Sequence, residues 1–93
     1  MQGLGILIEL LGLVVDFQLF KEVTERDIEE NIEKLKKYTW FQDFLKDDEY
    51  RELITYNKNV RHRIGRFNTK KLDKDFYNAR CQEKLEKAIL KEL

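Results

Sequence analysis

The feature that most constrains the fold is an abrupt change in charge at Phe20. Residues 1–20 contain no lysine or arginine, whereas residues 21–93 contain all 18 basic residues of the chain. The full length of 93 residues suffices for one domain with a small core. The sequence therefore predicts an apolar helix over residues 1–20, followed by a charged helical domain over residues 21–93.

The apolar segment carries a narrow stripe of glycines and acids. On a helix that turns about 100° per residue, four residues fall within roughly 60° of one another: Gly5, Glu9, Gly12 and Asp16. A helix over residues 3–20 would be about 27 Å long, which is enough to cross a thin hydrocarbon core. An ionised carboxylate near the middle of a membrane span costs about 2.5–3.5 kcal/mol. We therefore expect the stripe to face another copy of the chain or a water-filled lumen, which predicts a homo-oligomer.

Two other structures fit the same residues. The segment could be the central helix of a small soluble bundle, with the stripe at the one edge that meets water. It could also be a β-hairpin, because "ILIEL" and "LVVDFQL" are rich in β-branched residues and Gly12 suits a turn. If the segment spans a membrane, the basic flank places residues 21–93 on the cytoplasmic side. The expected location is the cytoplasm, or the inner membrane with residues 21–93 in the cytoplasm.

The charged domain has the composition of uninterrupted helices. The chain contains no proline, and 39% of its residues are charged. Thr24 and Asp27 have the spacing of a capping box, and Val23 and Ile28 occupy the positions of a hydrophobic staple. A helix should therefore begin near Thr24 and end near Tyr38.

Similar signals predict two further helices. A short aromatic helix should run from Thr39 to about Lys46, and Asp47 or Asp48 should cap the next helix. Six apolar and aromatic residues share an arc of roughly 120° on that helix, which predicts one long core-facing helix that stops at Gly65. These six are Tyr50, Leu53, Tyr56, Val60, Ile64 and Phe67.

The last predicted helix, from about Thr69 to Glu92, changes its apolar face midway. One set of residues points one way, namely Leu72, Phe76 and Ala79. The other set points nearly opposite, namely Tyr77, Cys81, Leu85 and Ala88. Such a helix needs two sets of neighbours, from different helices or from another chain. The predicted fold class is all-α, with an N-terminal apolar helix followed by a small helical bundle.

A strongly basic segment suggests a binding surface. Within "NKNVRHRIGRFNTKK" no acid separates the six cations, which are Lys58, Arg61, Arg63, Arg66, Lys70 and Lys71. With Tyr56 and Phe67 beside them, they suit nucleic acid, nucleotide phosphate or lipid headgroups. The alternative is a solvated helix face that pairs with the acidic run between Glu25 and Glu33.

Residues that could carry catalysis are scarce. The chain has one histidine, His62, and one cysteine, Cys81, and no serine. We therefore expect no enzyme activity, metal site, cofactor or small-molecule substrate. The predicted function is a small interaction or assembly protein that self-associates through its apolar helix, with membrane anchoring as an extension. The alternative is a soluble helical regulator that binds nucleic acid or nucleotide phosphate through residues 58–71.

Overall fold

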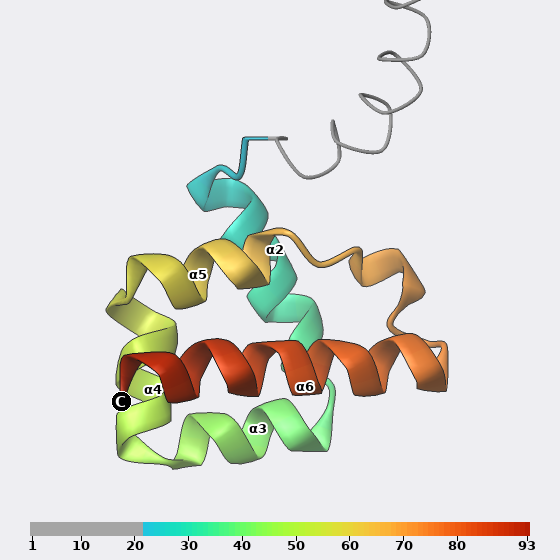
Figure 1. Cartoon of the computed structure of the whole chain (residues 1–93). Helices are drawn as coiled ribbons and strands as arrows, with labels where there is room; N and C mark the ends of the chain where they lie inside the picture. The colour runs from blue at the N-terminus through green and yellow to red at the C-terminus, as the bar shows by residue number, and fades with distance from the viewer. Residues whose placement is uncertain (1–21) are drawn as a thin grey trace, which may run out of the picture.

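The computed structural model describes residues 22–93, and this part of the chain is entirely helical apart from turns (Figure 1). Its elements are α2 (Glu25–Leu35), α3 (Thr39–Lys46), α4 (Asp48–Tyr56), α5 (Lys58–Gly65), the 3₁₀ turn η1 (Thr69–Lys71) and α6 (Asp75–Glu92). The prediction of an all-α fold is confirmed for these residues. The apolar helix, with its stripe of Gly5, Glu9, Gly12 and Asp16, lies outside them, so its structure and its role in self-association remain predictions.

Two predicted helix starts are confirmed in detail. The hydroxyl of Thr24 accepts a hydrogen bond from the backbone N–H of Asp27 at 3.1 Å, and the Asp27 carboxylate accepts one from the Thr24 N–H at 3.0 Å. This capping box opens α2. Asp47 caps α4, because its carboxylate accepts the backbone N–H of Tyr50 at 3.0 Å. Helix α3 runs from Thr39 to Lys46 as predicted, and Tyr38 is its N-cap.

The prediction of one long helix ending at Gly65 is wrong, because the chain breaks at Asn57. The backbone of Asn57 is extended, and this residue is both the C-cap of α4 and the N-cap of α5. Its side-chain oxygen accepts the backbone N–H of Val60 at 3.0 Å, which is the local bond by which asparagine competes with helix continuation. The break moves Tyr56 off the predicted core face, and this side chain is 79% exposed.

The prediction of one helix from Thr69 to Glu92 is also wrong. The first residues form η1 and a turn, and α6 begins only at Asp75. Leu72 is buried in that turn, whereas Phe76 and Ala79 are exposed. In consequence, α6 has a single core face, formed by Cys81, Leu85 and Ile89.

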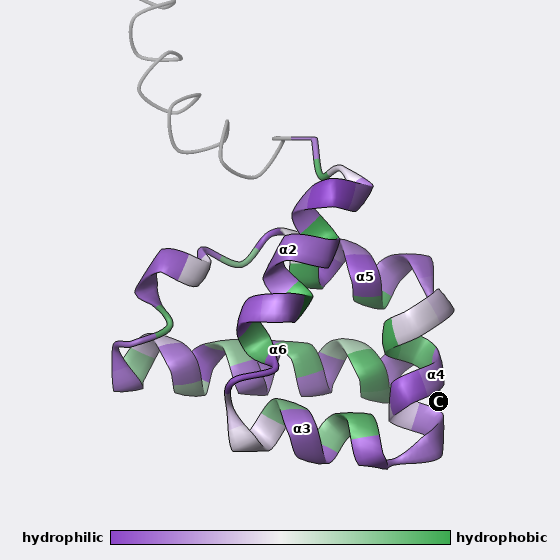
Figure 2. Ribbon diagram, turned by 180° about the vertical axis from the view of Figure 1, so that it is seen from behind, coloured by the Kyte–Doolittle hydropathy of each residue, from purple (hydrophilic) through white to green (hydrophobic). Residues whose placement is uncertain are grey.

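Helix α6 lies at the centre of the bundle. Figures 1 and 2 show α5 and α3 on opposite sides of it. Helix α2 crosses behind α6 in the view of Figure 1 and in front of it in the opposite view of Figure 2. The indole N–H of Trp40 in α3 donates to the Asn78 side chain in α6 at 2.7 Å. The most deeply buried side chains come from α2, α3, α5 and α6, namely Leu35, Phe41, Val60, Ile64, Cys81, Leu85 and Ile89.

Contacts at the end of α5 fix this helix against α2. A Cβ added to Gly65 would lie 2.2 Å from Cγ1 of Val23 and 2.9 Å from Cγ1 of Ile28, so only glycine permits this approach. Beside it, the buried side chain of Asn31 donates to the carbonyl oxygens of Ile64 at 2.8 Å and Phe67 at 3.1 Å. These contacts hold the basic residues of α5 in a defined place.

Candidate anion-binding groove

Basic side chains from two helices meet between α5 and α6. Helix α5 directs Val60 and Ile64 into the core, which leaves Arg63 on its outer surface, and Arg66 follows as its C-cap. On α6 the exposed cations recur every three or four residues, so they lie along one side of the helix. They are Lys84, Lys87 and Lys91.

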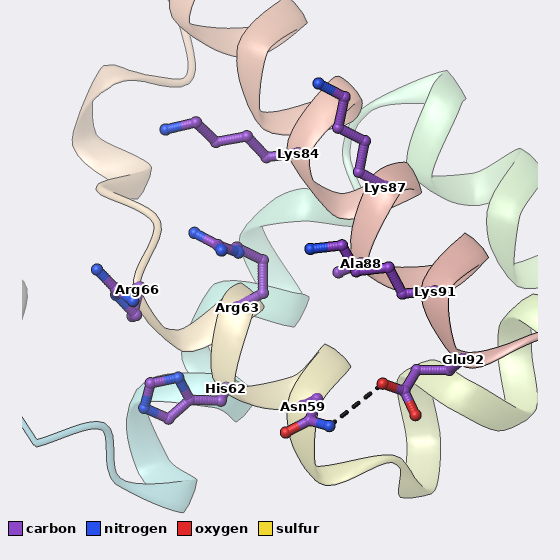
Figure 3. Close-up of a pocket in the computed structure, with 9 residues that line it drawn as sticks. All are labelled: Asn59, His62, Arg63, Arg66, Lys84, Lys87, Ala88, Lys91 and Glu92. Carbon is purple, nitrogen blue, oxygen red and sulfur yellow. Dashed lines mark hydrogen bonds between the residues drawn. The ribbon is translucent and has the colours of Figure 1, made fainter.

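These residues line a groove with a volume of about 460 Å³ (Figure 3). Its lining consists of Asn59, His62, Arg63, Arg66, Lys84, Lys87, Ala88, Lys91 and Glu92. Figure 3 shows Arg63 and Lys91 extending into the space between the helices, with Lys84 on the same side. Lys87 points away from α5, and His62 lies at the outer edge.

The groove is strongly positive. Five of the lining side chains are lysines or arginines and one is a carboxylate, that of Glu92. Among residues 22–93, none of the five cations forms an ion pair. Glu92 lies at one end, where it accepts hydrogen bonds from the side-chain amides of Asn57 at 3.0 Å and Asn59 at 3.2 Å. Low-dielectric walls with charges of one sign concentrate the field and attract anions.

Arg61, one of the six cations of the basic segment, is engaged elsewhere in the protein. Its guanidinium donates to the carbonyl oxygens of Ile54 at 2.9 Å and Thr55 at 3.1 Å, which belong to the last turn of α4. It also forms an ion pair with Glu25 at the start of α2, and its side chain is 17% exposed. Arg61 thus joins three helices, and its pairing with the acidic run agrees with the alternative expected from the sequence.

The other residues of the basic segment are dispersed. Lys70 lines a second, mixed-charge pocket beside α2, while Lys58 and Lys71 are exposed outside the groove. Phe67 is buried and Tyr56 does not line the groove, so neither offers a stacking surface there. The lysines of α6 were not predicted as site residues, although their spacing opposite the apolar face of that helix is a signal that could have identified them.

Other kinds of site have little support within the described chain. Burial raises the pKa of the Cys81 thiol, so the thiolate required of a nucleophile is disfavoured. No group of three or more potential His, Cys, Asp or Glu metal ligands occurs in residues 22–93. The helices of this region are too short or too polar to cross a membrane.

Comparison with known proteins provides no relative. No family model matches the chain, and no curated protein or solved structure matches it significantly.

Proposed function

We propose that this chain is a non-enzymatic binding protein whose groove between α5 and α6 holds the phosphate groups of a nucleic-acid strand. The observation that carries the proposal is the gathering of five cations, none of them in an ion pair within residues 22–93, from two helices around one hollow. Lysine and arginine side chains that contact phosphates release condensed counterions, and this release drives binding.

The extent of the cationic surface favours a strand over a single phosphate group. Lys84 and Lys91 are seven residues apart in α6, which corresponds to about 10 Å along the helix axis. A nucleic-acid strand carries one phosphate per nucleotide, and a cationic surface of this length can contact more than one of them. The groove lining has no Phe, Tyr or Trp, so the groove itself offers no ring on which a base can stack, and the proposed contacts there are with phosphates.

Self-association through the apolar helix complements this proposal. Copies joined along the stripe of Gly5, Glu9, Gly12 and Asp16 would present several grooves to one strand. Linked sites raise the effective concentration of each second contact, and overall binding strengthens without any new contact.

The test compares two double variants that remove equal charge. The variant Arg66→Gln with Lys84→Gln removes two groove cations, and Lys58→Gln with Lys71→Gln removes two cations outside it. Binding of a labelled single-stranded oligonucleotide is measured by fluorescence anisotropy over a range of salt concentrations. A plot of log K against log salt falls with a slope of about −0.7 per phosphate contact for single strands. The groove variant loses two such contacts, so its plot should be less steep than that of the parent by about 1.4.

The control variant should keep a slope close to that of the parent protein. Equal losses in the two variants would show a diffuse charge effect and would refute a groove site. Absence of oligonucleotide binding at low salt, or binding only to vesicles of anionic lipid, would refute the proposed ligand.

A further inference from the structure

An exposed aromatic residue extends the row of cations on α6. Phe76 is 75% exposed, and the guanidinium carbon of Arg80 lies 5.6 Å from the centre of its ring. Arg80 lies about one turn before the first groove lysine, Lys84, and Phe76 lies about two turns before it. The resulting stripe recurs every three or four residues and is exposed throughout, and it consists of Phe76, Arg80, Lys84, Lys87 and Lys91.

We infer that Phe76 is a stacking platform for an unpaired base of a strand whose backbone lies in the groove. This inference rests on the proposed function and narrows its ligand to single-stranded nucleic acid. Phe76 and Lys91 are 15 residues apart in α6, a distance of about 22 Å along the axis, so one strand can contact both.

The chemistry of the pair suits a base on one side of the ring. Arg80 lies against the ring of Phe76, and the large exposed fraction of the ring leaves surface for a second planar group. Single-strand binding sites combine a positive groove that follows the backbone with aromatic side chains on which bases stack. In a duplex the bases are already paired and stacked, so Phe76 would have no partner there.

The experiment separates base stacking from phosphate binding by the choice of ligand. The full chain is titrated with a labelled single strand of about ten nucleotides, within the range that single-strand-binding folds cover, and with an abasic strand of the same length. Phe76→Ala should weaken binding of the base-bearing strand by about five- to 150-fold, the usual cost of losing one base stack. The same change should leave binding of the abasic strand within about twofold, because the phosphate contacts are intact.

Two further variants define the effect. Leu90→Ala removes another exposed apolar side chain from α6, outside the stripe, and should leave both affinities unchanged. Phe76→Trp should retain affinity, and the added indole fluorescence should be quenched by the base-bearing strand and not by the abasic one. This optical signal reports stacking even if affinities change through another route.

Each outcome has a distinct meaning. In one outcome the parent protein binds both strands, Phe76→Ala changes neither affinity and Phe76→Trp shows no quenching. This outcome would overturn the stacking role of Phe76 and would leave the groove proposal intact. Equal affinity for duplex and single strand would also overturn it. Parent protein that binds neither strand would refute the proposed function and the stacking role together.

Discussion

Replacing Asn31 by leucine should markedly destabilise the fold, because this one amide connects α2 to the end of α5. The Asn31 amide nitrogen donates to the carbonyl oxygens of Ile64 at 2.8 Å and Phe67 at 3.1 Å, and the residue is 8% exposed. The hydroxyl of Thr69 donates to the amide oxygen at 3.4 Å, which orients the amide nitrogen toward the two carbonyls. Leucine has a similar volume and no donor.

The substitution affects the hydrogen bonding of the two carbonyl groups unequally. The Ile64 oxygen also accepts the backbone N–H of Phe67 at 3.1 Å, so it keeps a partner in the variant. The Phe67 oxygen loses its bond with Asn31 in a buried environment, at a cost of about 1–3 kcal/mol. With about 1 kcal/mol for the second bond, the expected loss of unfolding free energy is about 2–4 kcal/mol. For a domain of this size each 1 kcal/mol lowers Tm by about 4–8 °C.

The assay is urea unfolding of the full chain, followed by far-ultraviolet circular dichroism. The matched control is Gln42→Leu, because the exposed Gln42 side chain also donates to a backbone carbonyl, that of Lys36 at 2.7 Å. Water can replace that bond, so the control should lose less than about 1 kcal/mol. If the two substitutions lowered the free energy of unfolding equally, the claim that burial makes the Asn31 hydrogen bonds more stabilising would be refuted.

Two further predictions concern alkaline pH and self-association. Burial raises the pKa of Tyr50, Tyr77 and Cys81, so the native state holds these protons more tightly than the unfolded chain. The free energy of unfolding should keep its full value below the ordinary cysteine pKa of 9.0 and fall above it. The fall should be smaller in Tyr50→Phe, and a urea midpoint that stays constant to pH 10.0 would contradict this prediction. Gly12→Leu should dissociate the predicted oligomer by separating helix backbones, and an unchanged mass in light scattering would exclude that seam.

The parts of the fold that depend on neighbouring residues could be predicted from the sequence. Thr24 and Asp27 satisfy each other over three residues, so their capping box needs no knowledge of the rest of the chain. Asp47 caps α4 in the same local way. The break at Asn57 was missed because an asparagine inside a periodic apolar pattern also fits an uninterrupted helix. The local cap and the packing of two helices together decide the outcome.

The groove could be predicted only in part, because it unites segments far apart in the sequence. Arg63 and Arg66 stood out through their basic segment, whereas the lysines of α6 are interspersed with acids and look like an ordinary solvated face. In the sequence nothing distinguishes Arg61 from the neighbouring cations of residues 58–71. Its role depends on Glu25 and on the end of α4, which only the folded chain brings together.

The single-residue joint at Asn57 makes the groove sensitive to chain length. Asn57 is the only residue between α4 and α5, and it caps both helices. Its side-chain amide donates a hydrogen bond to Glu92 at the end of α6. Each residue added after that joint would turn the rest of α5 by about 100° and advance it by about 1.5 Å. Arg63 would then leave the side of α5 that faces the lysines, even though every side chain was still present. The number of residues between Asn57 and Arg63 therefore determines whether the cations of α5 face those of α6. Over this stretch the site should tolerate substitutions better than insertions or deletions.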